Sequence, residues 1–123
     1  MDGQVFNIVF NAEAARYLRR MTERPELMPA HLGDQINEMF GRAGTRLADA
    51  PRVQIDAVGE IGGDGDMLVR AKFGSAARAL IRARAIEEEI DDADVVCEMV
   101  DRHFRRKNAW AINGCRVKAV EIP

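Results

Sequence analysis

Apolar residues near the start of the chain follow the spacing of a β-strand. The stretch VFNIVF at residues 5–10 bears apolar side chains on both faces of an extended strand, because Asn7 is its only polar residue. Such a strand is expected to be buried on both faces, and a strand buried on both faces is usually central in a sheet. We therefore predict a central strand at residues 5–10.

Helical spacing follows this strand. Asn11 can accept hydrogen bonds from the first free amides of a helix, and the apolar residues of AEAARYLRRMTER after it recur at helical intervals. Pro25 is expected to end this helix, and Pro29 suits the first position of a second one, where a missing N–H is not needed. The second helix is predicted to run to about residue 50, because Pro51 prevents its continuation.

Period-two alternation returns in the middle of the chain. The stretches RVQIDAVGEI (52–61) and MLVRAKF (67–73) both alternate apolar and polar residues. Each should therefore have one buried face, which we call the dry face, and one face that contacts solvent or a partner. The intervening GGDGD tolerates positive φ, which predicts an antiparallel hairpin. The residues expected on the dry face are Val53, Ile55, Ala57, Met67, Val69, Ala71 and Phe73.

The longest helical pattern extends over residues 75–106, which contain neither proline nor glycine. With Ser75 as the expected N-cap, this segment predicts one long helix, or two helices with a kink near DDAD (91–94). The residues of its predicted buried stripe are Leu80, Ala83, Ile86, Ile90, Ala93, Cys97, Val100 and Phe104.

A hairpin is predicted at the end of the sequence, because Asn113-Gly114 suits a type I′ turn and lies between the apolar-rich runs AWAI and CRVKAVEI. The predicted order is β-α-α-β-β-α-β-β. Without its last strand, this order corresponds to the split β-α-β arrangement, in which helices cover one face of an antiparallel sheet. We therefore expect residues 1–123 to form one two-layer α+β domain of a ferredoxin-like variant.

Composition is that of a globular protein, with 47% hydrophobic and 31% charged residues. The net charge of −2 shows no overall basic excess of the kind that nucleic-acid-binding proteins carry. No apolar run has the length of a membrane helix, and the first residues lack the pattern of a secretory signal, so we expect a soluble, cytoplasmic protein. Cys97 and Cys115 are accordingly expected to be reduced thiols that pack in a helix and a strand.

Acidic residues are concentrated in IEEEIDDAD (86–94), which has six carboxylates in nine positions. On one convex helix these side chains fan outward, whereas Ca²⁺ or Mg²⁺ needs oxygens that converge on one point. We interpret the stretch as a solvated helix face; the alternatives are an acidic docking surface for a basic partner and a metal or catalytic site. The acids that share one strip are Glu87, Asp91 and Asp94.

Basic residues are concentrated in RHFRRKNAW (102–110). Cations next to aromatic rings can bind a nucleic-acid backbone and stack on bases, but cations at a helix C-terminus also complement the helix dipole, and Phe104 belongs to the buried stripe. Trp110 is either a core residue or an interface anchor. The candidate partner-binding residues here are Trp110, Arg102, Arg105, Arg106 and Lys107.

The sequence contains no clear motif of catalytic or metal-binding residues. Neither His31 nor His103 has zinc-ligand spacing around it, and Cys97 and His103 lie about 120° apart around a helix, too far to act as a thiol and its base. The glycines of GEIGGDGD (59–66) lead from strand to strand and not into a helix N-terminus, so they do not form a phosphate loop. We predict no catalytic, cofactor or metal site.

These patterns favour a non-catalytic interaction or assembly module that self-associates through a sheet face or edge, or docks on a larger complex. A helix of ~45 Å would be longer than the strands of ~20 Å beside it, so the sheet of one subunit would not cover the whole apolar stripe of the helix. One alternative is an inhibitor whose acids 87–94 mimic nucleic-acid phosphates. The other is a nucleic-acid-binding regulator, for which the basic residues are Arg102, Arg105, Arg106, Lys107, Arg116 and Lys118.

Overall fold

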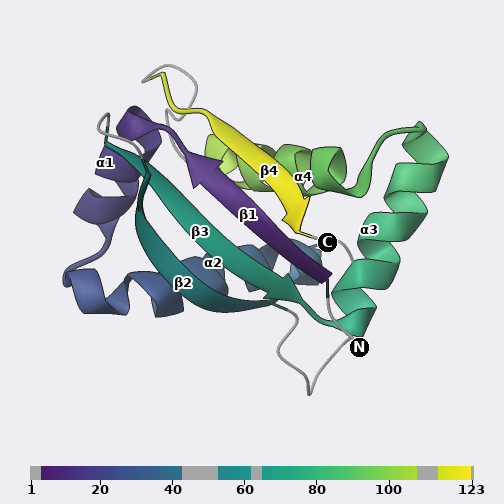
Figure 1. Ribbon diagram of the computed structural model, residues 1–123, viewed down its shortest axis with the longest axis horizontal. Helices are drawn as coiled ribbons and strands as arrows, with labels where there is room; N and C mark the ends of the chain where they lie inside the picture. Colours follow the sequence, from purple (N-terminus) through teal and green to yellow (C-terminus); the bar gives the residue numbers. More distant parts are fainter. Residues whose placement is uncertain (1–3, 43–52, 62–64, 108–113, 123) are drawn as a thin grey trace.

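A four-stranded antiparallel sheet and four α-helices make up the fold in the computed structural model, which describes residues 4–42, 53–61, 65–107 and 114–122 (Figure 1). The strands lie in the order β2-β3-β1-β4. The predicted α+β class is confirmed. The elements are β1 (Gln4–Phe10), α1 (Ala12–Met21), the 3-10 turn η1 (Pro25–Leu27), α2 (Met28–Arg42), β2 (Val53–Ile61), β3 (Asp66–Phe73), α3 (Ser75–Glu88), α4 (Asp92–Lys107) and β4 (Val117–Ile122).

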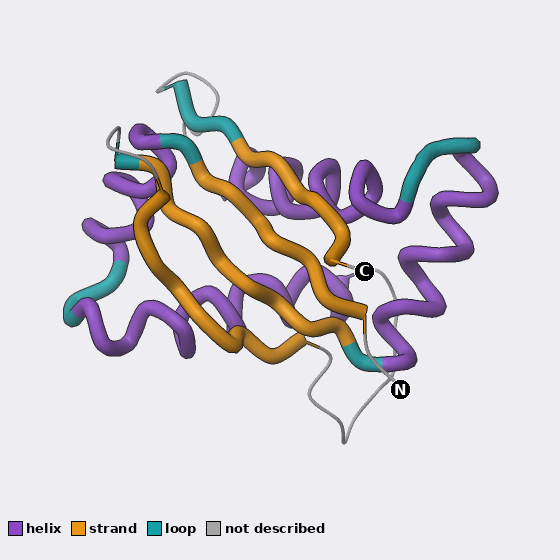
Figure 2. The backbone as a smooth tube through the Cα atoms, in the orientation of Figure 1, coloured by secondary structure: helices purple, strands orange, loops and turns teal. Residues whose placement is uncertain are grey.

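The described helices cover one side of the sheet, and none of them covers the other side (Figure 2). Helix α2 contacts β2, α4 contacts β4, and the two helices contact each other behind the sheet. Helix α1 packs against β1 and β3, while α3 extends beyond the end of the sheet (Figure 1). The described elements therefore form two layers, and none of the described helices lies on the second face of the sheet.

Strand β1 is central, as its apolar pattern predicts, and pairs with β3 on one side and β4 on the other. Phe6, Ile8 and Phe10 point toward the helices and are fully buried. Val5 and Val9 on the other face are only half-buried, so the expectation of burial on both faces is wrong. The reason is that only one face of the sheet is covered by helices.

Asn11 caps helix α1 as predicted, with its Oδ1 accepting from the Ala14 amide at 3.0 Å. The same oxygen accepts from the Arg116 amide at 2.9 Å, and Nδ2 donates to the Gly114 carbonyl at 2.8 Å. One side chain therefore fixes both the start of α1 and the entry to β4. The helix itself ends at Met21, four residues before Pro25.

Strands β2 and β3 form the predicted antiparallel hairpin, and the predicted dry positions of β3 are buried. A β-bulge at Asp56 shifts the alternation of β2, so that Ala57 pairs with Arg70 on the uncovered face and is exposed. The expectation that Ala57 lies in the core is therefore wrong. Val58, the next residue, turns inward instead.

The segment 75–106 forms two helices, α3 and α4, so the alternative with a kink near DDAD is confirmed and a single continuous helix is wrong. The break follows Glu89, which adopts the left-handed conformation at φ 56° and caps α3. Gly74 is the N-cap in place of Ser75, which is the first helical residue. Because α3 has 14 residues and α4 has 16, no single helix of ~45 Å overhangs the sheet, and the expectation of an uncovered stripe on such a helix is wrong.

The break also changes which residues of α3 are buried. Ala77, Ile81 and Ala85 face the core, whereas Ala83 and Ile86 of the predicted stripe are exposed. A left-handed residue between two helices resets the helical phase, so α3 and α4 do not share one stripe. In α4 the stripe is partly as predicted, because Val100 and Phe104 are buried; Val95, Val96 and His103 are buried as well.

The core between sheet and helices is built on aromatic contacts. The rings of Phe6 and Phe73 meet edge to face at 5.4 Å, and Phe40 of α2 meets Phe73 at 5.9 Å. Phe10 of β1 and Phe104 of α4 meet in the same way at 6.1 Å. These contacts join β1 directly to α4 through Phe10 and indirectly to α2 through Phe73 of β3.

Strand β4 confirms the second strand of the predicted terminal hairpin, and Gly114 has the positive φ expected of its turn. Trp110, the first strand of that hairpin and the end of the second predicted helix near residue 50 lie outside the described residues. Among the helices that are described, none is both long and apolar enough to span a membrane.

Candidate interaction surface

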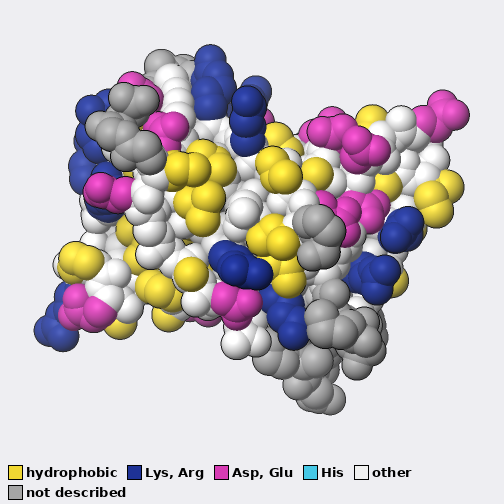
Figure 3. Space-filling model, viewed as in Figure 1, with side chains coloured by type: hydrophobic (Ala, Val, Ile, Leu, Met, Phe, Trp, Pro, Cys, Tyr) yellow, Lys and Arg dark blue, Asp and Glu magenta, His cyan; other side chains and the backbone are white. Residues whose placement is uncertain are grey.

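The side of the sheet that no described helix covers faces the viewer in Figure 3, and we call it the open face. Its membership follows from the pairing register, because directly paired residues of neighbouring antiparallel strands project to the same side. Asn7 of β1, for example, pairs with Arg70 of β3 and with Val120 of β4. The open face consists of Val5, Asn7, Val9, Gln54, Ala57, Gly59, Ile61, Asp66, Leu68, Arg70, Lys72, Lys118, Val120 and Ile122.

Aliphatic side chains make up much of this surface. Val120 is 59% exposed, and Ile61 is also among the exposed large hydrophobic residues. Val5, Val9, Leu68 and Ile122 are half-buried by their neighbours on the strands. Scattered single apolar residues on a surface are ordinary, but a contiguous set on one flat face is typical of an interaction site.

Uncompensated positive charge accompanies these aliphatic side chains. Arg70, Lys72 and Lys118 are exposed, and no ion pair joins any of them to another of the described residues. The paired positions of the open face include one acid, Asp66 at the start of β3. The open face is therefore apolar and basic.

A second feature lies where α3 meets α4, beyond the end of the sheet (Figure 1). Ile86 is 72% exposed, the largest exposure among the large hydrophobic residues that the structure describes. Exposed acids follow it in the sequence. We call this feature the acidic corner, which consists of Ile86, Glu87, Glu88, Glu89, Asp91 and Asp94.

Asp92 does not belong to this exposed set, because its side chain is only 10% exposed. Its carboxylate accepts from Gln4 Nε2 at 2.8 Å and lies 3.5 Å from Arg82 Nε. Gln4 Nε2 also donates to Glu121 at 2.9 Å. The expectation that all six acids face water is therefore wrong for Asp92, which joins α4 to β1 and to α3.

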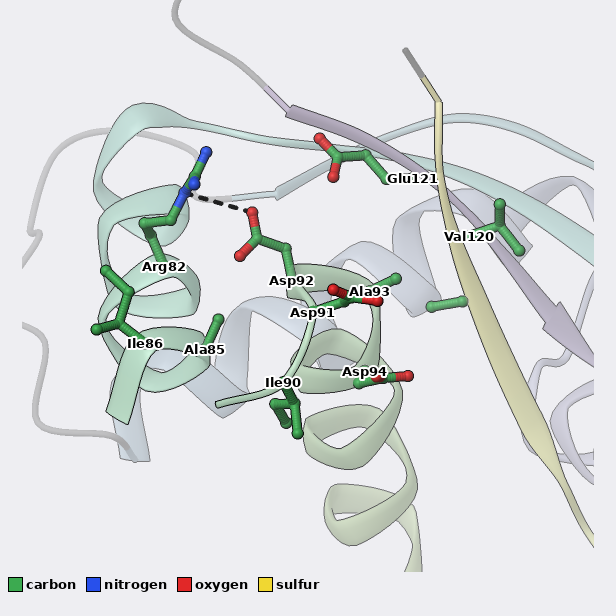
Figure 4. Close-up of a pocket in the computed structure, with 11 residues that line it drawn as sticks. Arg82, Ala85, Ile86, Ile90, Asp91, Asp92, Ala93, Asp94, Val120 and Glu121 are labelled. Carbon is green, nitrogen blue, oxygen red and sulfur yellow. Dashed lines mark ion pairs between the residues drawn. The ribbon is translucent and has the colours of Figure 1, made fainter. Parts of the chain in front are cut away.

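A cavity of about 660 Å³ opens between the acidic corner and strand β4 (Figure 4). Its aliphatic wall includes Ile86, Ile90 and Val120, and its acids include Asp91, Asp94 and Glu121. Ile86 and Val120, the two most exposed large hydrophobic residues of the described chain, thus line the same cavity. The open face and the acidic corner meet there, because Val120 belongs to the open face.

Another cavity, of about 510 Å³, lies between the end of α1, the turn η1 and strand β2. Apolar groups such as Met28, Val58 and Met67 line it, and the ion pair between Arg19 and Glu60 at 3.5 Å lies at its border. Thr22 in its wall already donates to the Leu18 carbonyl at 2.9 Å. We find no polar group in its described lining that lacks a partner and points to a ligand.

The residues predicted to bind a partner are not brought together in one place. Glu87, Asp91 and Asp94 are exposed at the acidic corner. Arg102 and Arg106 are exposed on α4, where Arg105 pairs with Asp101 at 2.7 Å. Lys107 is the last residue of α4, and Trp110 lies outside the described residues.

Arg70 and Lys72 were not among the predicted site residues, although they are the most prominent charges of the open face. The signal that could have found them was the alternation of MLVRAKF, whose polar positions were already expected on a wet or partner-facing side. What the sequence did not show was that strands β1 and β4 would bring apolar residues beside them. That arrangement follows from the sheet order.

Two potential catalytic groups, His103 and Cys97, are engaged in structural contacts. His103 is buried, with Nε2 2.9 Å from Gln35 Oε1 and 3.8 Å from Glu38. Cys97 and Cys115 are free thiols, and Cys97 Sγ donates to the Val117 carbonyl at 3.2 Å. Burial raises the pKa of both thiols, so their neutral form is favoured. Over the described ranges, no group of three or more His, Cys, Asp or Glu is placed to hold a metal ion.

Comparison with known proteins places this chain in no family. No family model matches the sequence, and neither a curated protein nor a solved structure matches it.

Proposed function

We propose that this protein is a non-catalytic interaction module that binds an acidic protein surface through its open face. The observation that carries the proposal is the combination of exposed aliphatic side chains with Arg70, Lys72 and Lys118 on an uncovered sheet face. Removing aliphatic groups from water supplies affinity, and complementary charge supplies orientation and a faster association rate. An anionic partner with apolar residues at its contact surface satisfies both.

The chemistry of this face favours protein over single-stranded nucleic acid. Sheet faces that bind single strands use aromatic rings on which bases stack. In β1 and β3 the aromatic residues are Phe6, Phe10 and Phe73, and all of them point to the helices. The open face presents aliphatic groups in their place, and these suit the apolar contacts of a protein interface.

We also infer that the fold is a variant of the ferredoxin-like, split β-α-β arrangement. Antiparallel pairing of β1 with β3 and of β2 with β3 supports this, as does the position of the helices on one side of the sheet. The variation lies in the connections, because α1 and α2 follow β1 and α3 and α4 follow β3. In this arrangement the uncovered sheet face is available for binding.

Site-specific photo-crosslinking tests the proposed function. A photoreactive amino acid replaces Val120 on the open face or, as a control, Leu27 on η1, which is 48% exposed. We expect the probe at position 120 to form a protein adduct that the double substitution R70E/K72E abolishes, and the probe at position 27 to lack that adduct. Identical adducts at both positions, or insensitivity to the charge reversal, would contradict the proposal.

A second candidate is the nucleic-acid-binding regulator, favoured by the exposure of Arg102, Arg106, Arg116 and Lys118. Phosphate contacts release counterions, so such binding weakens steeply as salt is added. A mobility-shift titration at low and moderate salt measures it. Reversal of Arg102 and Arg106 should then abolish the shift, whereas reversal of Arg70 and Lys72 should leave it.

A further inference from the structure

The occupant of the open face can be inferred from the charges that have no ion-pair partner among the described residues. Arg70, Lys72 and Lys118 have no ion-pair partner among the described residues. A surface that covers them must supply carboxylates and an apolar group, because burial of an unpaired charge is strongly unfavourable. A second sheet face of the same kind fails this requirement, since it would oppose cation to cation.

The chain itself carries a surface that meets the requirement. Glu87, Glu89, Asp91 and Asp94 of the acidic corner have no ion-pair partner among the residues that the structure describes. Glu88 of the same corner differs from these four acids, because Arg84 pairs with it at 3.6 Å. Ile86, in the last turn of α3, is the exposed apolar group next to them in the sequence.

We propose that the open face binds a second copy of this chain, whose acidic corner rests on Arg70, Lys72 and Lys118 with Ile86 against the aliphatic side chains. This inference rests on the proposed function and names its partner. The shape permits the contact, because α3 extends the corner beyond the end of the sheet, where it is free to reach another molecule (Figures 1 and 3). The basic side chains can lay their aliphatic stems along Ile86 while their charged ends meet the carboxylates.

The two complementary surfaces adjoin each other on one molecule. Val120 belongs to the open face and also lines the cavity at the acidic corner. If each of two copies places its acidic corner on the open face of the other, the two form a closed two-fold dimer. If two copies share only one such contact, further copies add head to tail and build a ring or an open chain. The mass of the assembly distinguishes these forms, and the chemistry of the contact is the same in each.

A charge-swap experiment with two full-length variants tests the inference. The face variant is R70E/K72E/K118E, and the corner variant is E87K/D91K/D94K. Each variant alone opposes like charges at the contact, but a mixture of the two restores opposite charges at both contacts. All six positions are exposed, so we expect both variants to fold, which circular dichroism and thermal unfolding verify.

Sedimentation velocity over 1 to 100 μM is the measurement. We expect the wild-type protein to associate at low salt and to dissociate as salt is added. Each variant alone should associate at least tenfold more weakly, and the equimolar mixture should recover the assembly. A wild-type protein that is monomeric at 100 μM and low salt, or a mixture no heavier than its components, would overturn the inference.

The outcome separates this inference from the proposed function. A monomeric wild-type protein that still forms the Val120 photo-adduct with another protein retains the proposed function and refutes self-association. A monomer with no adduct refutes both. A control variant, R102E/R106E, changes exposed cations outside the open face and should leave the wild-type association unchanged.

Discussion

Gln4 at the start of β1 donates a hydrogen bond to Asp92 at the start of α4, at 2.8 Å and across 88 residues of sequence. The same amide nitrogen donates to Glu121 of β4 at 2.9 Å. One neutral side chain therefore holds two carboxylates at the end of the sheet from which the acidic corner extends.

Replacement of Gln4 by alanine should lower the free energy of unfolding by about 2–3 kcal/mol, because hydrogen bonds to charged groups are stronger than neutral ones and Asp92 would stay poorly solvated. Q4E should be at least as destabilising at neutral pH, since it adds a third carboxylate. Denaturant unfolding measures both variants. The control is Q54A on the exposed side of β2, and equal stability of Q4A and Q54A would contradict the interpretation.

Asn37 of α2 is expected to be indispensable for the position of β2. Its Oδ1 accepts from the Val53 amide at 2.9 Å, and its Nδ2 donates to the Val53 carbonyl at 3.0 Å and to the Gly33 carbonyl at 2.8 Å. N37A should lower the free energy of unfolding by about 1–3 kcal/mol, because backbone groups lose their partners. N37D keeps the acceptor and loses both donors.

Amide hydrogen exchange gives the local measurement for Asn37. We expect the Val53 amide to exchange faster in N37A, while it stays protected in N37D, which retains its acceptor. Unchanged protection of Val53 in N37A would show that the side chain does not hold the strand.

The two isoleucines of α3 provide a matched test of which residues of this helix are buried. Ile81 is fully buried and Ile86 is 72% exposed. I81A should lower the free energy of unfolding by about 2–5 kcal/mol, whereas I86A should change it by less than about 0.5 kcal/mol. Thermal or denaturant unfolding measures the pair. Comparable effects would mean that Ile86 packs in the core, as the periodicity of the sequence predicted.

Cys97 should react slowly with thiol reagents in the native protein. Burial raises its pKa first, and the negative charges of Asp101, Asp94 and Glu98 raise it further, against an opposing effect of Lys118. The thiolate is the reactive form, so modification at pH 8 should be slower in native than in denatured protein. D94N removes one of the negative charges and should accelerate the native reaction; a C97S variant reports Cys115 alone.

The raised pKa of Cys97 also fixes the sign of a pH effect on stability. The native thiol keeps its proton at a pH where the unfolded chain has lost it, so the unfolded state binds fewer protons there. Below the ordinary thiol pKa this group leaves the free energy of unfolding unchanged, and the stability falls as pH rises through the raised value. A C97S variant should show a smaller decline at alkaline pH.

Much of the fold was predictable because it depends on local periodicity. The strand pattern at 5–10, the cap at Asn11 and the alternation of MLVRAKF all encode interactions between near neighbours in the chain. A kink near DDAD was one of two alternatives, but the left-handed conformation of Glu89 and the bulge at Asp56 were not predicted. The apolar periodicity continues through both positions, so periodicity alone does not locate the changes of phase.

The candidate site was less predictable than the fold. Separate basic and acidic stretches were visible in the sequence, but Arg70 and Lys118 lie on different strands, and β1 is the strand that brings them onto one face. In the sequence nothing distinguishes Asp92 from its acidic neighbours. In the structure it differs from them because it accepts a hydrogen bond from Gln4.

By itself, the sequence determined the class of the fold, the central place of β1 and the local signals that start α1 and form the β2–β3 hairpin. It did so because hydrophobic periodicity and caps act over a few residues. Only the tertiary structure decided that one sheet face stays uncovered, that Ile86 points to solvent and that Asp92 is held by Gln4. These depend on contacts between residues many positions apart, which no local pattern records.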